Sequence, residues 1–284
     1  MSQKDLRALM AAENPLIVPS IYDGISALAF REHGFKAAYI GSYGTGATRY
    51  GLPDIGYIGP EDMADQVRRL APLVQVPVIV DAEAGWGNPL HVARNTKLLE
   101  QAGAAALHIE DHVFGKHITR KPTIVALDTA VDKIKAALDA RDSEDFLVIA
   151  RTDSSQSHGG VEAVRRLLAY QEAGADALFL AGMLTPEEWK TLTAEARIPI
   201  VVCDSPGVSA AEFAQLGAGV VIYYALAHMS ATPAMRTAYA ALAAEGSTVS
   251  IEESWNGVQG VLGYDAFLGG DAVRAKAEQY GLLG

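Results

Sequence analysis

The sequence predicts an α/β protein folded as a (β/α)8 barrel, a TIM barrel, with an extra helical segment at its C-terminal end. Three observations support this fold: a chain of 284 residues suits one barrel of roughly 250 residues, a weak internal repeat marks successive strands, and strand-like segments alternate with helix-like ones. The alternative is an open doubly wound sheet. That sheet requires a glycine fingerprint after its first strand, and residues 21–26 (IYDGIS) lack one.

The repeat defines four strands, and other apolar runs add four more. In each copy of the repeat a glycine that ends a helix precedes an apolar strand; the copies are residues 33–40, 102–109, 173–180 and 216–223. The added strands are residues 16–20, 76–80, 146–150 and 199–203. The run at 76–80 is β-branched and does not alternate, which indicates burial on both faces, as in a parallel sheet.

Helix-patterned segments separate these strands, at residues 62–73, 91–101, 129–140, 161–172 and 187–194. Eight strands alternating with helices are typical of the barrel. An alanine-rich helix at 229–245 follows the last strand. We therefore assign residues 1–246 to the barrel and residues 247–284 to an extension that packs on the barrel or on a neighbouring subunit, and we expect a homo-oligomer.

Composition excludes several classes of function. The chain has 23 basic and 34 acidic residues, a formal net charge of −11, which disfavours binding to nucleic acid or anionic membranes. It has no apolar stretch long enough to span a membrane and no signal-peptide core near its N-terminus. Its single cysteine, Cys203, excludes an internal disulfide and is expected to be a buried apolar residue. We expect a cytoplasmic protein whose anionic substrate is held by local cations.

Polar residues gather at the predicted carboxyl ends of the strands, where α/β proteins place their chemistry. They are Asp23, Ser42, Asp81, Glu83, Glu110, Asp111, Arg151, Asp153, Asp204 and Tyr224. So many carboxylates at one rim repel one another unless a cation is present. Asp81 and Glu83 are two residues apart and are expected to point the same way from one strand. Hard oxygen ligands favour Mg²⁺ or Mn²⁺. The alternative is an acid pair that caps the next helix.

Arg151 can bind two oxygens of a substrate carboxylate or oxyanion at once. The alternative is a structural ion pair with Asp153 or Glu110. An imine mechanism requires a lysine at a strand end. No such position is held by Lys97, Lys116, Lys133, Lys135 or Lys190, so a metal-stabilised enolate is expected instead.

Five motifs resemble those of the isocitrate lyase and phosphoenolpyruvate mutase superfamily, in the same order and at nearly the same spacing. They are residues 51–56 (GLPDIG), 81–88 (DAEAGWGN), 109–114 (IEDHVF), 149–153 (IARTD) and 261–267 (VLGYDAF). The resemblance covers almost the whole chain. It implies a (β/α)8 barrel, a C-terminal helix swapped between subunits, and a homodimer or homotetramer. It also implies Mg²⁺ and an α-keto or α-hydroxy acid that reacts through an enolpyruvate-like oxyanion.

Carried over residue by residue, the resemblance makes Asp81 the direct metal ligand, with Glu83, Glu110 and Asp54 holding the waters of the metal. It places Ser42 and Tyr43 at the substrate carboxylate, together with Arg151. Tyr224 stands where some decarboxylating relatives have histidine. Glu83 and Ala84 stand where the family mostly has aspartate and threonine, and the longer glutamate is expected to displace the metal or its waters.

The loop at residues 115–122 (GKHITRKP) departs furthest from the family. Isocitrate and methylisocitrate lyases carry a cysteine motif there, and phosphonate-handling members carry Lys-Thr-Asn-Ser; this chain has neither. In this loop His117 is a candidate proton donor, and Lys116, Arg120 and Lys121 could neutralise a second acid group of the substrate. The alternative is a solvated basic loop. His108 is expected to be a core residue, and His112 remains a candidate for the site.

The sequence thus predicts a Mg²⁺-dependent lyase that cleaves a carbon-carbon bond in a small 2-oxo or 2-hydroxy di- or tricarboxylic acid. Decarboxylation needs no acidic cysteine. Retro-aldol cleavage would use His117 or Tyr43 as proton carrier. Phosphorus-carbon chemistry and a non-catalytic barrel that binds a metabolite are the alternatives.

Overall fold

The computed structural model describes residues 5–113, 115–118, 121–255 and 260–282. Phe114, in the motif at residues 109–114, and Arg120, in the loop at residues 115–122, lie outside these residues. The chain divides into two compact units, Met1–Ala227 and His228–Gly284. This division lies inside helix α11 (Leu226–Glu245), whereas the sequence assignment places the boundary after that helix. The packing of residues 247–284 therefore stays a prediction.

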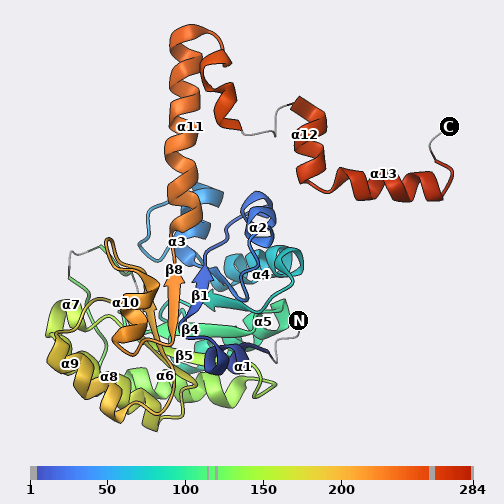
Figure 1. Ribbon diagram of the computed structural model, residues 1–284. Helices are drawn as coiled ribbons and strands as arrows, with labels where there is room; N and C mark the ends of the chain where they lie inside the picture. The colour runs from blue at the N-terminus through green and yellow to red at the C-terminus, as the bar shows by residue number, and fades with distance from the viewer. Residues whose placement is uncertain (1–4, 114, 119–120, 256–259, 283–284) are drawn as a thin grey trace. The chain divides into compact units, whose positions relative to one another are not determined.

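The first unit is built on eight parallel strands that form a nearly closed barrel (Figure 1). The strands are β1 (Leu16–Pro19), β2 (Ala38–Ile40), β3 (Val78–Asp81), β4 (Ala106–Glu110), β5 (Leu147–Thr152), β6 (Ala177–Leu180), β7 (Ile200–Cys203) and β8 (Val220–Tyr223). Neighbours in sequence are hydrogen-bonded neighbours in the sheet, and β1 pairs with β8. A single parallel bridge between Ser20 and Tyr39 joins β1 to β2. The predicted barrel is confirmed.

Helices follow the strands and lie outside them (Figure 1), except for the first helix, which precedes the first strand and packs against inward-facing strand residues. The helices of the first unit are α1 (Asp5–Ala12), α2 (Gly24–Arg31), α3 (Ser42–Thr45), a π-helical turn (Gly46–Tyr50), α4 (Pro60–Val74), α5 (Pro89–Ala102), α6 (Leu127–Ala140), α7 (Ser155–His158), α8 (Gly160–Glu172), α9 (Pro186–Glu195) and α10 (Ala210–Gln215). Local sequence sets the bounds of α5: the Asn88 side chain accepts hydrogen bonds from the first turn, and Pro89 occupies the first helical position.

The repeated glycines end helices in the way the sequence indicates. Gly34, Gly103, Gly174 and Gly217 have φ angles of +69°, +106°, +97° and +100°. A residue with a side chain rarely adopts this left-handed conformation, so glycine reverses the chain at little cost between each helix and the following strand. The repeat therefore marks the connection between a helix and the following strand at four places in the barrel.

Two apolar clusters hold the barrel together. One lies between strands and helices and includes Val80, Leu99 and Leu167. The other gathers inward-facing strand residues such as Ile149 and Phe179 with residues of α1. Both faces of the strands are thus buried, as the apolar runs without alternation predicted. The polar ends of the strands are held in a fixed register by this core.

The second unit is helical where it is described. After most of α11 it contains a 3-10 helix (Val249–Trp255), α12 (Gly260–Phe267) and α13 (Gly270–Gln279). Tyr239, Leu242, Val273 and Tyr280 are large apolar residues exposed on this unit. None of the helices in the described part of the chain combines the length and apolar character needed to cross a membrane.

Candidate metal and substrate site

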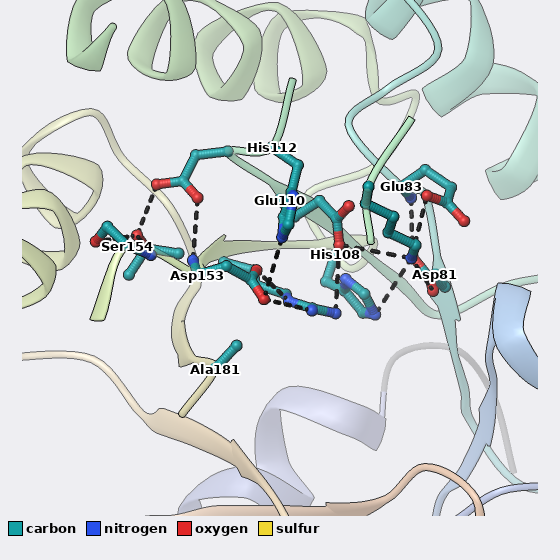
Figure 2. Close-up of polar contacts among 12 residues, drawn as sticks. Asp81, Glu83, His108, Glu110, His112, Asp153, Ser154 and Ala181 are labelled. Carbon is teal, nitrogen blue, oxygen red and sulfur yellow. Dashed lines mark hydrogen bonds and ion pairs between the residues drawn. The ribbon is translucent and has the colours of Figure 1, made fainter. Parts of the chain in front are cut away.

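The polar rim is built mainly by β3, β4 and β5. Asp81 is the last residue of β3, Glu110 is the last residue of β4, and Arg151 lies beside Glu110 in the register of β4 and β5. Figure 2 shows Asp81 and Glu83 on one side of Glu110 and Asp153 on the other. Because parallel strands end at one rim, residues far apart in sequence meet there.

Asp81 and Glu83 are brought together by a turn. The β3 strand ends at Asp81, and Glu83 lies beyond it with a φ angle of +49°. The Asp81 Oδ1 atom accepts a hydrogen bond of 2.8 Å from the Glu83 N–H. The expectation that both residues lie on one face of a strand was therefore wrong, because Glu83 lies beyond the end of β3. Both side chains still reach the same cluster. The left-handed backbone of Glu83 redirects its side chain.

Three side-chain hydrogen bonds hold this turn in place. The ammonium of Lys133, on α6, donates to the Ala84 carbonyl at 2.8 Å, and Asn95, on α5, donates to the Gly85 carbonyl at 3.2 Å. The indole of Trp86 donates to the Ile58 carbonyl at 2.8 Å. Lys133 and Asn95 are buried. The turn that carries Glu83 is thus tied to two helices and to a neighbouring loop.

Lys116 lies at the centre of the predicted metal ligands. Its Nζ atom is 3.1 Å from Glu83 Oε2, 3.5 Å from Asp54 Oδ1, 3.7 Å from Glu110 Oε2 and 3.9 Å from Asp81 Oδ2. The residue is only 4% exposed. The sequence placed Lys116 on a loop away from the strand ends, and that expectation was wrong for its side chain. The interpretation of this residue as part of a solvated basic loop is also wrong.

The charges in this cluster are strongly coupled. Burial raises the pKa of Glu83 to about 8, although Lys116 opposes the shift, and burial also raises the pKa of Glu110. Burial would raise the pKa of Asp81 too, but Lys116 and His108 hold it well below its usual value. Four surrounding carboxylates raise the pKa of Lys116 well above its usual value despite burial. A protonated lysine is a poor nucleophile, so an imine mechanism remains disfavoured.

The donor set fits a hard divalent cation. The Glu83 Oε1 atom and both Glu110 carboxylate oxygens are buried without a hydrogen-bond partner. Buried carboxylate oxygens without partners are costly, and Mg²⁺ selects oxygen ligands. As the described side chains are placed, no three of the His, Cys, Asp or Glu residues stand in an arrangement that could hold a metal ion. The acids surround an ammonium at 3.1 to 3.9 Å, whereas Mg²⁺ binds its ligands at about 2.0–2.1 Å.

Arg151 has both of the partners that the sequence suggested. Its Nε and Nη2 atoms donate to the two carboxylate oxygens of Asp153 at 2.8 Å each, and Nη1 is 3.4 Å from Glu110 Oε2. The guanidinium also lies over the ring of Phe179, at 5.2 Å from the centroid. Arg151 is therefore fixed in direction beside the acid cluster.

Ser42 binds Asp81, and the two tyrosines lie together. The Ser42 hydroxyl donates to Asp81 Oδ2 at 2.7 Å, and the Ser42 N–H donates to the same oxygen at 3.2 Å. The rings of Tyr43 and Tyr224 are 6.3 Å apart and partly buried. Asp204 accepts a hydrogen bond from the Tyr224 N–H. Ser42 thus reaches the cluster from the start of α3, just after β2, and Tyr224 lies just after β8.

Histidines occupy both the loop and the barrel interior. His117 Nε2 is 3.4 Å from Asp54 Oδ2, and burial lowers the pKa of His117, which Asp54 opposes and Lys116 reinforces. The ring of His112 is 5.6 Å from that of His117, and His112 Nε2 is 3.4 Å from Asp153 Oδ1. His108 is fully buried and its Nε2 atom lies 2.9 Å from the Tyr39 hydroxyl.

Other predicted rim residues do not reach the cluster. Asp23 caps helix α2 by accepting from the Ser26 N–H. Asp111 is buried and accepts hydrogen bonds from Thr152, Asp153 and Tyr170 and from a buried arginine of α8. Both Asp23 and Asp111 are structural.

Cys203 is only partly buried and packs against the inner cluster of the barrel. Lys121 is exposed.

Sequence reasoning missed the central position of Lys116 and the support of the turn by Lys133. The available signal for Lys116 was its closeness in sequence to Glu110. For Lys133 it was the position of a lysine on the apolar face of α6, beside Ile134 and Ala130.

Comparison with known proteins places this site in context. A family model described as phosphoenolpyruvate phosphomutase matches residues 6–243. The 2,3-dimethylmalate lyase of Eubacterium barkeri is 33% identical over 88% of this chain and 89% of its own length. A crystal structure of 2,3-dimethylmalate lyase superposes with a TM-score of 0.88, at 32% identity and coverage of 99% of this chain and 96% of that one.

Two further proteins differ in their chemistry. An oxaloacetate decarboxylase of Rhodopseudomonas palustris is 37% identical over 71% of this chain and 70% of its own length. A structure of phosphonopyruvate hydrolase with oxalate and Mg²⁺ has a TM-score of 0.86, at 28% identity and 99% coverage of both chains.

Proposed function

Because the chain belongs to the phosphoenolpyruvate mutase family, within the isocitrate lyase and phosphoenolpyruvate mutase superfamily, we propose that it is a Mg²⁺-dependent carbon-carbon lyase. Its substrate class is a small 2-oxo or 2-hydroxy di- or tricarboxylic acid. The observation that carries the proposal is the convergence of four carboxylates beside a fixed arginine at the carboxyl ends of the strands.

Asp81, Glu83, Glu110 and Asp54 hold the cation in this proposal, directly or through water. A bound Mg²⁺, or Mn²⁺ in its place, supplies positive charge that stabilises the enolate formed when the bond breaks. Ser42 fixes the direction of the Asp81 carboxylate through two hydrogen bonds to one oxygen. The turn held by Lys133 fixes the direction of Glu83.

Arg151 binds the substrate carboxylate or the developing oxyanion in this proposal. Its Nε and Nη2 atoms are already held by Asp153, which leaves Nη1 directed toward the cluster. Ser42, Tyr43 and Tyr224 complete the substrate pocket, because they approach the same rim from β2 and β8. Two partly buried phenols beside the cluster would suit a small acid with an apolar substituent.

His117 is the proposed proton carrier. Burial lowers the pKa of His117 and so favours the neutral imidazole, which is the form needed by a base that removes the hydroxyl proton in retro-aldol cleavage. His117→Ala should therefore lower kcat by 10²-fold or more with an unchanged melting temperature. Full activity of this variant would end the role of His117, and Tyr43→Phe would then be the next variant to assay.

Phosphorus-carbon chemistry is the second candidate, since a phosphonopyruvate hydrolase has the same fold at 28% identity. The deciding experiment is proton and phosphorus NMR of the purified protein with Mg²⁺ and a panel of oxaloacetate, substituted malates, methylisocitrate and phosphonopyruvate. Pyruvate or another keto acid released from oxaloacetate, a substituted malate or methylisocitrate would support the lyase. Orthophosphate released only from phosphonopyruvate would support the second candidate.

The same assay tests the metal and the alternative of a non-catalytic barrel. EDTA should abolish turnover and added Mg²⁺ should restore it. Asp81→Ala should abolish turnover while circular dichroism shows an intact fold. Turnover that resists both EDTA and this substitution would contradict the proposed metal site, and no turnover with any acid would contradict the lyase.

A cytoplasmic homodimer or homotetramer is part of the proposal. The large apolar residues exposed on the second unit, among them Tyr239 and Leu242, support subunit contacts there. Light scattering of the purified protein would give the number of subunits.

A further inference from the structure

Lys116 lies where the proposed function places a metal ion. Its ammonium lies among all four proposed metal ligands and 3.3 Å from the Ser42 hydroxyl, to which it donates. The residue is 4% exposed, so its charge is compensated by the carboxylates with little help from water. In this structure the Lys116 ammonium is the positive charge at the centre of the four carboxylates.

The ammonium does not satisfy the acids completely. Glu83 Oε1 and both oxygens of Glu110 remain without a hydrogen-bond partner, and three of the four distances from Nζ to a carboxylate are 3.5 Å or more. These are distances of charge attraction, beyond short hydrogen bonds. A cation with more charge and closer coordination would satisfy the same oxygens better.

Two cations cannot share this position. A divalent ion bound by Asp81, with its waters on Glu83, Glu110 and Asp54, would lie among the oxygens that now surround Nζ. It would repel the ammonium strongly at such a short separation in a buried site. Lys116 also lies between Gly115, with a φ angle of +90°, and His117, with a φ angle of +61°. The left-handed φ angle of His117, a residue with a side chain, is uncommon, so the backbone next to Lys116 is held in an unfavourable conformation.

We propose that Lys116 and the divalent cation exclude each other, so that metal loading requires the Lys116 side chain to withdraw from the cluster. The inference rests on the proposed function, since it takes the metal site from there. Lys116 is then an internal competitor that keeps the acids together before loading and lowers the apparent affinity for the metal. Metal binding and the position of residues 115–118 are coupled.

The first test is Mn²⁺ binding to the full-length protein, measured from the electron paramagnetic resonance signal of free Mn²⁺. Lys116→Met keeps a stem of similar length and removes the charge. It should lower the Kd for Mn²⁺ by about tenfold or more, because the competing conformation is lost. Lys190→Met, on α9, is the matched control: it removes the same charge from an exposed position and should change Kd by no more than about twofold.

Asp81→Ala separates this inference from the proposed function. If Asp81→Ala abolishes Mn²⁺ binding and Lys116→Met binds more tightly, both are supported. If Asp81→Ala abolishes binding and Lys116→Met binds as the unmodified protein does, or more weakly, the exclusion is wrong and the metal site stands. If the unmodified protein binds no Mn²⁺, or if Asp81→Ala binds it normally, both are wrong.

The second test uses the unmodified protein and does not depend on the folding of a variant. Brief acetylation with an N-hydroxysuccinimide ester, read by mass spectrometry of peptides, reports the access of reagent to each lysine. Labelling of Lys116 should be slow in EDTA and rise severalfold with saturating Mn²⁺, while labelling of the exposed Lys190 stays constant. Unchanged protection of Lys116 at saturating Mn²⁺ would overturn the proposal.

Discussion

Arg151 and Asp153 form a bidentate ion pair, in which the two carboxylate oxygens of Asp153 each accept a hydrogen bond of 2.8 Å from the guanidinium. Asp153 is almost fully buried. Of the three guanidinium nitrogens of Arg151, only Nη1 does not bind Asp153, and it lies 3.4 Å from Glu110 Oε2. The planar fork of arginine is needed to hold Asp153 and to reach the cluster at the same time. A lysine cannot do both.

Arg151→Lys should therefore lower kcat/KM by about 100-fold or more, because one fixed donor to a developing oxyanion contributes on that order. The measurement is steady-state turnover of whichever acid the NMR panel identifies, with a thermal unfolding curve for each protein. Arg165→Lys, on the exposed face of α8, is the matched substitution and should leave kcat/KM unchanged. A value of kcat/KM for Arg151→Lys within threefold of the original would remove Arg151 from the proposed substrate site.

Lys133→Met should weaken Mn²⁺ binding by about tenfold, the opposite direction from Lys116→Met. The substitution removes the hydrogen bond to the Ala84 carbonyl that holds the turn carrying Glu83, and outer partners of metal ligands contribute on this order to affinity. Titration with Mn²⁺ measures the effect. Lys135→Met, at an exposed position of the same helix, is the control. Equal Kd values for the two variants would show that the turn holds without Lys133.

Asp111→Asn should lower the free energy of unfolding by about 3–5 kcal/mol. The substitution leaves the buried Arg166 without its negatively charged partner, and it can turn an amide N–H toward groups that are themselves donors. Chemical denaturation followed by circular dichroism gives the value. Glu172→Gln breaks an exposed ion pair with Arg197 and should leave the free energy of unfolding almost unchanged. A loss of similar size in both variants would mean that the Asp111 network adds little stability.

His108 should make stability depend on pH. Burial lowers the pKa of His108 to about 4 in the folded protein, against 6.5 for the ordinary group, and Asp81 only partly opposes the shift. The contribution is complete above pH 6.5 and is lost as pH falls toward 4, because the unfolded chain then binds a proton that the folded protein does not. The loss approaches about 1.4 kcal/mol per pH unit.

The measurement for His108 is the difference in free energy of unfolding between the unmodified protein and His108→Gln, taken from pH 7 to pH 4. The difference should shift in favour of the variant as pH falls across this interval. His33→Gln, at an exposed position, reports the effect of the same substitution on the surface. A difference that stays constant with pH would contradict the low pKa of His108.

The fold and most of the candidate site could be predicted from the sequence. Glycines such as Gly103 mark the ends of helices through their backbone freedom, and runs such as residues 78–80 mark buried strands, so local chemistry and period are enough to place Asp81, Glu110 and Arg151 at one rim. The direction of Glu83 could not be predicted in the same way, because a left-handed residue in a turn leaves no periodic signal.

The sequence by itself determined the barrel and the acids at the ends of its strands, since both follow from local patterns repeated along the chain. Only the tertiary structure decided what lies between those acids. Lys116 comes from a loop without period, and Lys133 reaches the β3 turn from a helix that follows β4. Their positions depend on long-range packing and on the attraction of buried carboxylates for the nearest cation, which no local pattern encodes.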